Sequence, residues 1–306
     1  MAPHVRSITA IGRLTALVVA LGTCCWLVFS HESNVDAAVY QPISSDANLE
    51  QLVRNSGLVA LGKSVFEDKN LSFKRNMSCA TCHSIKAGGT AASDIGNRLV
   101  GVHAGSSFEG FDKPPSHDNA MGFRNVQTST YVAFSPPLER VLQNNTVVFE
   151  GGNFWDGRAT GFFTGRSSQE QATQPPIGTL EGQLPSPACV VYRVLNPSNP
   201  KSYPIAYTSV FGTNITRVVW PSDIESQCTT ANGSVSFLSK GRNFTSNSQV
   251  QLAYNNIALS LMTYEGSQAM SPFDSKYDQV LQGKAQLTSS EKRGMDLFNG
   301  KAKCAS

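Results

Sequence analysis

The 306-residue sequence carries almost no excess of charge of either sign: 25 Lys and Arg oppose 22 Asp and Glu, which leaves a formal net charge of +3 at pH 7. A balance this close to neutral provides no strongly basic surface of the kind that binds nucleic acid. Cysteine is scarce as well, with seven residues, and beyond residue 38 only one group of Cys and His is closely spaced. A structural zinc site needs a second ligand pair, so this scarcity argues against one.

Long hydrophobic runs are also few. The amino-terminal apolar run, Leu14 to Phe29, is shorter than the roughly 20 residues that a membrane-spanning helix needs. It follows a positively charged start and precedes small residues that suit cleavage after Ala37 or Ala38. We therefore expect residues 1–38 to be a signal peptide that directs the chain to the periplasm. An uncleaved membrane anchor is the alternative.

The closely spaced group is Cys79-Ala80-Thr81-Cys82-His83. With this spacing, two thiols bond the former vinyl groups of a haem and the following imidazole binds the iron. We interpret Cys79 and Cys82 as thioether anchors of haem c and His83 as the proximal iron ligand. A redox-active dithiol would need a βαβ context, which the surrounding sequence lacks. The export signal also favours covalent haem.

Three further cysteines follow the motif: Cys189, Cys228 and Cys304. In an oxidising compartment Cys189 and Cys228 most simply form a disulfide, and two buried free thiols are the alternative. Cys304 lies in the closing stretch Gly300–Ser306, where two more residues, Cys and His, would complete a second haem motif. We therefore expect Cys304 to be the first anchor of a second haem in a longer protein. A natural terminus with an unrelated cysteine is the alternative.

Apolar residues at helical spacing predict two amphipathic helices. The first apolar stripe consists of Leu58, Leu61, Val65 and Phe66, and the second consists of Leu252, Ile257, Leu261 and Met262.

Shorter signals predict three more features. Thr288-Ser289-Ser290-Glu291 is a capping box that opens a further helix. A β-rich run at Thr146–Phe149, broken by Gly151-Gly152 and resumed at Asn153–Trp155, predicts a hairpin between these two segments. Ser271–Phe273 begins a linker.

Several longer strings occur in one order along the chain. They are Leu61-Gly62-Lys63-Ser64-Val65-Phe66, the haem motif, Arg124-Asn125, Phe154-Trp155-Asp156-Gly157-Arg158-Ala159, Gln171-Ala172 and Gly294-Met295-Asp296-Leu297-Phe298. In order and approximate spacing, from about residue 58 to 306, they resemble the bacterial di-haem cytochrome c peroxidase family, including its MauG-like members. The resemblance implies a mainly α, cytochrome c-like two-domain di-haem peroxidase whose second domain is incomplete here. Residues 39–270 would form the peroxidatic haem domain, and residues 271–306 would begin the carboxy-terminal cytochrome c domain.

The resemblance also assigns two catalytic residues. Trp155 matches the tryptophan between the two haems of the family, although the sequence alone favours a buried core aromatic. Glu181 stands ten positions after Gln171, where the family carries an acidic residue of the distal pocket. Such a carboxylate moves a proton between the two oxygens of peroxide. Without the resemblance, Glu181 would be a solvated loop charge.

The distal ligand and a metal site are implied in the same way. His117 stands seven residues before Arg124, the position of the displaceable distal histidine of the peroxidases. His103 and Met121 compete with it, and MauG-like members have no such histidine. Asn125 matches a family residue that helps to bind calcium between the domains.

The implied activity is reduction of hydrogen peroxide to water in the periplasm. Electrons would come from a small cytochrome c or cupredoxin, the full-length protein would hold two haems c, and a homodimer is a further expectation. Two other functions fit the same motifs: a MauG-like haem oxidase and a non-catalytic electron-transfer cytochrome c.

Overall fold

The computed structural model describes residues 47–91, 124–143, 145–196, 203–218, 220–230 and 249–305. All of these residues belong to the compact unit Val39–Ser306. The predicted export segment 1–38 lies outside the described residues, as do His103, His117 and Met121. No helix within the described part of the chain is long and apolar enough to cross a membrane.

The two longest described helices, α2 (Ser56–Glu67) and α10 (Gln249–Glu265), pack against each other. α2 begins at Asn55, whose side chain accepts a hydrogen bond from the backbone N–H of Leu58 at 3.1 Å. This cap satisfies one of the amides that the first helical turn leaves free. The buried face of α2 is the predicted stripe of Leu58, Leu61, Val65 and Phe66.

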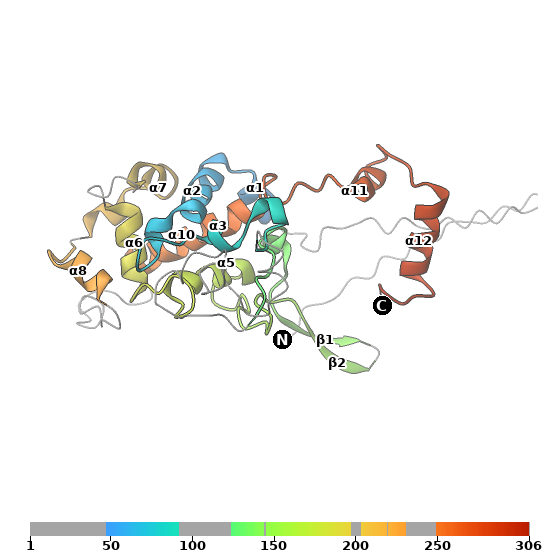
Figure 1. The fold of residues 1–306 in the computed structure, drawn as a ribbon, viewed down its shortest axis with the longest axis horizontal. Coiled ribbons are helices and arrows are strands. Elements are labelled where there is room, and N and C mark those ends of the chain that lie inside the picture. The colour runs from blue at the N-terminus through green and yellow to red at the C-terminus, as the bar shows by residue number, and fades with distance from the viewer. Residues whose placement is uncertain are drawn as a thin grey trace, which may run out of the picture. The chain divides into compact units, whose positions relative to one another are not determined.

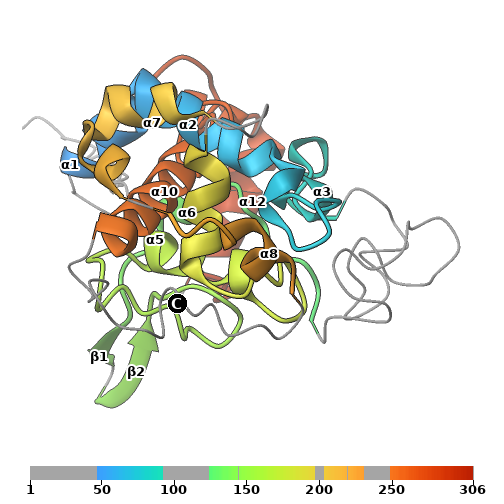
Figure 2. The ribbon, with the colours of Figure 1, turned by 90° about the vertical axis from the view of Figure 1, so that its left-hand side faces the viewer.

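α10 packs against α2, α5 (Ser167–Ala172) and α6 (Pro187–Leu195) (Figure 1). Figure 2 shows α2 and α7 (Pro204–Phe211) lying together above α10. Ile257, Leu261 and Met262 are buried, as predicted, whereas Leu252 is 49% exposed. The prediction for Leu252 was wrong because a spacing of five residues turns it away from the face that Ile257 shares with Leu261.

α2 and α10 approach each other most closely at Gly62. A Cβ at this position would lie 1.9 Å from the carbonyl oxygen of Ser260, far inside van der Waals contact. Beside this crossing the rings of Phe66 and Tyr264 pack edge to face, with centroids 5.3 Å apart. The tight approach therefore depends on the missing side chain of Gly62.

We expect Gly62→Ala to lower the free energy of unfolding by about 1–3 kcal/mol, because the added methyl group must separate the two helices. Gly294→Ala is the matched control: it lies in α12 (Ser289–Asn299), and an added Cβ would have no atom within 4 Å. There the substitution should stabilise the protein by about 0.5–1 kcal/mol. Urea unfolding measures both changes. Equal effects of the two substitutions would contradict the close helix crossing.

The remaining described elements are short. The helices are α1 (Ala47–Val53), α3 (Cys79–Cys82), α8 (Ile224–Thr229) and α11 (Lys276–Leu281), and the single 3₁₀ turns are η1 (Lys69–Leu71), η2 (Ile85–Ala87), η3 (Val132–Phe134), η4 (Pro175–Ile177) and η5 (Asn214–Arg217).

A disulfide joins α6 to α8. Cys189 and Cys228 form it as predicted, with their Cα atoms 5.5 Å apart and both residues fully buried. By constraining the unfolded chain, a loop of this length stabilises the fold by about 4 kcal/mol in the chain-entropy picture.

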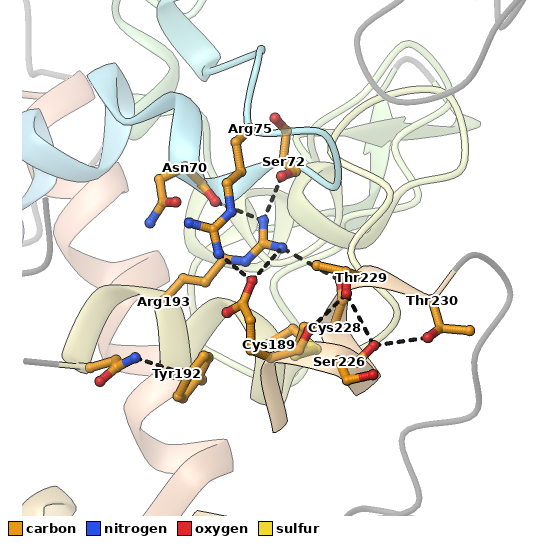
Figure 3. A network of polar contacts seen from close by, with 12 residues as sticks. Asn70, Ser72, Arg75, Cys189, Tyr192, Arg193, Ser226, Cys228, Thr229 and Thr230 are labelled. Carbon is orange, nitrogen blue, oxygen red and sulfur yellow. Dashed lines mark hydrogen bonds and ion pairs between the residues drawn. A yellow bond between two sulfur atoms is a disulfide. The ribbon is translucent and has the colours of Figure 1, made fainter. Parts of the chain in front are cut away.

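Arg193 of α6 lies beside this disulfide and is only 1% exposed (Figure 3). Its Nη1 donates to the carbonyl oxygens of Asn70 at 2.8 Å and Ser72 at 2.5 Å, and its Nη2 lies 3.9 Å from the Glu225 carboxylate. The hydroxyl of Ser72 in turn accepts the backbone N–H of Met77 at 3.0 Å. Arg193 thus connects α6 to the loop that delivers the chain to the Cys-x-x-Cys-His motif.

The sheet within the described residues is a single hairpin of β1 (Glu139–Gln143) and β2 (Thr146–Glu150), paired antiparallel with Leu142 opposite Val147. The predicted hairpin at Thr146 was confirmed, but its predicted partner, Asn153–Trp155, was wrong. Asn145 adopts a positive φ of 62°, which closes a tight turn toward the preceding strand. Gly151 and Gly152, also at positive φ, then lead the chain away from the hairpin.

The predicted carboxy-terminal capping box is present. The side chain of Thr288 accepts the backbone N–H of Glu291 at 3.3 Å, and the Glu291 carboxylate accepts the backbone N–H of Thr288 at 2.7 Å, which starts α12. Lys276 of α11 donates to the same carboxylate at 2.6 Å. α11 thus begins within the segment that was expected to be a linker.

Candidate haem site

The Cys-x-x-Cys-His motif forms the single helical turn α3. The side chain of Thr81 accepts the backbone N–H of Ser78 at 3.0 Å, and the backbone N–H of His83 donates to the carbonyl oxygen of Cys79 at 2.9 Å. One helical turn places side chains three residues apart on the same face. Neither Cys79 nor Cys82 forms a disulfide, and both are of intermediate exposure, so their sulfurs can form two bonds to one edge of a porphyrin.

The ring of His83 is fixed by the turn that follows it. Its Nδ1 lies 2.9 Å from the carbonyl oxygen of Gly89, and because a carbonyl only accepts, Nδ1 carries the proton. This leaves Nε2 with a lone pair for a metal. Gly89 has a φ of +75°, and a Cβ there would lie 2.8 Å from the backbone nitrogen of Ser129. Glycine at this position therefore orients the imidazole.

A cavity of about 500 Å³ opens beside this motif and is lined by Cys79, Cys82 and His83. Its volume lies in the range of roughly 300–1,000 Å³ that is usual for cofactor pockets. Much of its wall is apolar. Helices α2, α6 and α10 contribute Val65, Val190, Ile257, Ala258 and Leu261, and the chain between α2 and α3 contributes Leu71 and Met77. Such a wall suits the flat, apolar faces of a porphyrin.

The thiol of Cys79 does not resemble a reactive redox thiol. Burial raises its pKa, and the charges of Glu265 and Glu181 raise it further. A redox dithiol needs a lowered pKa. The environment of Cys79 therefore supports an anchoring role over thiol–disulfide exchange.

Glu181 lies in the same cavity, on the loop that follows η4. Its backbone N–H donates to the carbonyl oxygen of Gly178 at 3.1 Å, and a Cβ on Gly178 would lie 2.8 Å from the Glu181 carboxylate. Burial raises the pKa of Glu181, and the charge of Arg158 offsets part of this rise. Glu181 is thus half-buried against the cavity and is not the solvated loop charge that its local sequence suggests.

The two strings Arg124-Asn125 and Phe154–Arg158 lock together at the rim of the cavity. Arg124 pairs with Asp156 at 3.1 Å, and the indole N–H of Trp155 donates to the carbonyl oxygen of Asn125 at 3.0 Å. Arg158 pairs with Asp156 at 3.0 Å and lies 3.6 Å above the ring centroid of Phe154. This set of contacts holds the polar rim in one arrangement.

Trp155 is 61% exposed, so the interpretation as a core aromatic was wrong. Its neighbour Phe154 has a φ of 65°, and this left-handed conformation turns the chain outward. Trp155 lines the cavity and also faces solvent.

The residues predicted to bind metal lie in different places. The side-chain oxygen of Asn125 is buried and has no hydrogen-bond partner, so it is free to bind a cation. Nowhere in the described ranges do three or more His, Cys, Asp or Glu side chains cluster as metal ligands. Cys304 is an exposed free thiol after α12 and does not line the cavity. His117 lies outside the described residues.

Sequence reasoning missed Tyr254 and Glu265, which line the cavity. Both belong to the buried face of α10, and Glu265 follows Leu261 by four residues. The available signal was the helical spacing, because it places Glu265 on the same face of the helix as the apolar residues. The predicted stripe contained only apolar residues and so left out Glu265.

The donor set and the cavity fit a covalently bound haem c. Two thiols one turn apart, an imidazole oriented through its Nδ1 and an apolar wall all meet in one space. The fold and the site therefore define a c-type cytochrome domain with an acidic residue in its haem cavity.

Comparison with known proteins identifies the family. The family described as di-haem cytochrome c peroxidase matches residues 56–286, and the chain belongs to it. Methylamine utilization protein MauG of Paracoccus denitrificans is 28% identical over 244 residues, which are 80% of this chain and 49% of that protein. The mainly α, haem-binding fold predicted from the resemblance is thereby confirmed.

The diheme peroxidase BthA from Burkholderia thailandensis has a similar solved structure, with 25% identity and a TM-score of 0.52. The alignment covers 80% of this chain and 47% of that one, and a variant of the same peroxidase matches equally well. The chain thus spans about half the length of the relatives that it matches.

Proposed function

We propose that the protein is a periplasmic c-type haem peroxidase that reduces hydrogen peroxide to water. The observation that carries the proposal is a single cavity that holds Cys79, Cys82 and His83 together with the half-buried carboxyl group of Glu181. This arrangement supports cofactor attachment and proton transfer within one space. The cavity is also the right size for a cofactor.

Haem c, when bound, supplies a redox-active iron with a coordination position for peroxide. The protein supplies the ligand orientation and the protons. The carbonyl oxygen of Gly89 orients the His83 ring through Nδ1, and the apolar wall formed by α2 and α10 keeps water from the faces of the cofactor.

Glu181 acts as the acid/base of the reaction. As a carboxylate it removes a proton from one oxygen of hydrogen peroxide and returns it to the other, so that the O–O bond breaks with water as the leaving group. Two electrons and two further protons complete the conversion of H₂O₂ to two molecules of water. Burial raises the pKa of Glu181, which makes it a stronger base than an exposed glutamate.

Electrons enter through Trp155, which lines the cavity and also reaches solvent. They come from a small cytochrome c or a cupredoxin through a second haem, for which Cys304 is the first anchor.

His117 is the displaceable distal ligand, and Asn125 contributes its unpartnered side-chain oxygen to a calcium site. The proposal includes a homodimer, with residues 39–270 as the peroxidatic domain and residues 271–306 as the start of the second.

Covalent haem is the first test. The chain is produced in a host with c-type cytochrome maturation, and denatured gels are stained for haem. We expect staining of the wild type and of the Cys304→Ala variant, and none of the Cys79→Ala/Cys82→Ala double variant. Staining of the double variant would show that haem attaches elsewhere.

Turnover is the second test. The wild-type protein with haem is mixed with hydrogen peroxide and reduced cytochrome c in a stopped-flow instrument, and we expect the cytochrome to be oxidised in proportion to the peroxide added. A haem protein that leaves both reactants unchanged would be an electron carrier and would overturn the proposal.

The similarity to MauG supports a second candidate, a haem oxidase that uses peroxide to oxidise a protein or an organic substrate. The same cavity and Glu181 would serve it. Consumption of peroxide with an organic reductant, but without oxidation of reduced cytochrome c, would favour the oxidase.

A further inference from the structure

Glu265 is the last residue of α10 and a part of the cavity wall on which the haem proposal rests. It is 8% exposed, and its Oε2 is buried without a hydrogen-bond partner. A buried carboxyl group with an unpaired oxygen is costly, and natural proteins keep few of them. Its presence in the wall of a cofactor cavity therefore calls for a functional explanation.

The charged groups around α10 do not neutralise Glu265. Among the described side chains, the elements packed against this helix carry Glu50 on α1, Lys63 and Glu67 on α2, Glu170 on α5 and Arg193 on α6. None of these groups contributes to the state of Glu265, whose pKa is raised to about 8 by burial alone. The other titratable groups of the cavity are Asp68, Cys79, Cys82, His83, Arg124, Asp156, Arg158, Glu181 and Tyr254.

Glu265 lies close enough to Cys79 for its charge to raise the pKa of the Cys79 thiol. After burial, the charge of Glu265 is the largest influence on the Cys79 thiol, ahead of that of Glu181. In the haem protein this sulfur becomes a thioether and no longer titrates. The group that then experiences the charge of Glu265 is the porphyrin bonded to Cys79.

We propose that Glu265 is the redox-linked proton acceptor of the haem site: its carboxylate binds a proton when an electron from the donor protein reduces the haem anchored at Cys79. This inference rests on the haem site proposed above. The donor loses one electron, the haem gains it, and one proton from solvent joins the carboxylate as a neutral carboxylic acid. Reoxidation of the haem by peroxide releases that proton into the cavity, where peroxide reduction consumes protons.

The physical basis is the charge of the haem. A ferric haem carries one more positive charge than a ferrous haem, and a nearby positive charge favours the carboxylate. Reduction removes this charge and raises the pKa of Glu265, so the acid form becomes dominant.

Glu181 and Glu265 divide the proton chemistry because their surroundings differ. The charge of Arg158 partly offsets the effect of burial on Glu181, whereas no cation among the described residues does so for Glu265. Two carboxyl groups in one site with different environments take different roles. Glu181 serves the bond-breaking step, and Glu265 follows the charge of the haem.

The midpoint potential of the haem protein, measured between about pH 6 and 9, tests the inference. We expect the wild-type potential to fall as the pH rises, and the potential of Glu265→Gln to be nearly independent of pH over the same range. If the proton affinity of Glu265 differs tenfold between the two oxidation states, the midpoint potential changes by about 59 mV in total across this pH range. Glu67→Gln, an exposed site on α2, is the matched control and should keep the wild-type slope.

Infrared difference spectra of the reduced minus oxidised protein provide a second measurement, and its first outcome is read from the wild type alone. Reduction should produce the carbonyl band of a protonated carboxylic acid, and that band should persist in Glu181→Gln and vanish in Glu265→Gln. Equal potential slopes in wild type and Glu265→Gln, or no such band in the wild type, would overturn the role of Glu265. A wild-type protein without covalent haem would instead overturn the proposed function.

Discussion

Glu181→Gln is expected to slow peroxide reduction by about 100- to 10,000-fold, the usual contribution of one positioned acid/base group. Glutamine keeps the size and burial of the side chain but neither accepts nor returns the proton that the O–O bond requires. Covalent haem and its absorption spectrum should be unchanged, because Glu181 contributes no bond to the Cys-x-x-Cys-His motif. Stopped-flow mixing of the haem protein with peroxide measures the rate.

The pH profile of the same reaction gives an independent check. Because burial raises the pKa of Glu181, the rate of the wild type should fall on the acid side at a pH above the ordinary glutamate value of 4.5. The Glu181→Gln variant should lack this fall in rate on the acid side. Glu139→Gln, on an exposed residue of β1, is the control and should match the wild type. A wild-type rate in Glu181→Gln would remove Glu181 from the mechanism.

Raising the pH from about 5 to 9 should destabilise the wild-type protein by about 4 kcal/mol through Glu265 alone. The folded protein holds the pKa of this group near 8, against 4.5 in an exposed chain. Between these values the folded state keeps a proton that the unfolded state has released, so stability is full below about pH 4.5 and is lost as the pH rises through 8. The size follows from about 1.4 kcal/mol per pH unit.

The Glu265→Gln variant should lose this part of the pH dependence, because the amide matches the neutral acid in shape and does not ionise. Urea unfolding at several pH values measures the free energy of unfolding of both proteins. The difference between their curves isolates Glu265, since Glu181, whose pKa is also raised, is present in both. Parallel curves would show that Glu265 ionises in the folded protein as it does in an exposed chain.

Local sequence patterns predicted a large part of this fold. The stripe from Leu58 to Phe66 predicted α2, and the capping box at Thr288 predicted the start of α12. The Cys-x-x-Cys-His motif could also be identified from local sequence, because two thioether bonds and one iron ligand require a spacing that a single helical turn supplies. In each case the information lies within one or two turns of chain.

Predictions that depended on a distant partner were less successful. Asn153–Trp155 was paired with the strand at Thr146, whereas the true partner is the preceding strand Glu139–Gln143. Trp155 was assigned to the core from its apolarity, yet its position is set by the carbonyl oxygen of Asn125, thirty residues away in the chain. The family resemblance assigns Trp155 to a place between two haems, and that assignment stays a prediction.

Sequence by itself determined the Cys-x-x-Cys-His spacing, the helices α2, α10 and α12, and the family, because each rests on spacing along the chain. Only the tertiary structure decided which acids lie in the haem cavity and what state they adopt. The pKa of Glu181 and Glu265 depends on burial, and burial arises where α2, α3, α6 and α10 meet around one space. No stretch of sequence contains that meeting point, since more than a hundred residues of chain lie between α3 and α6.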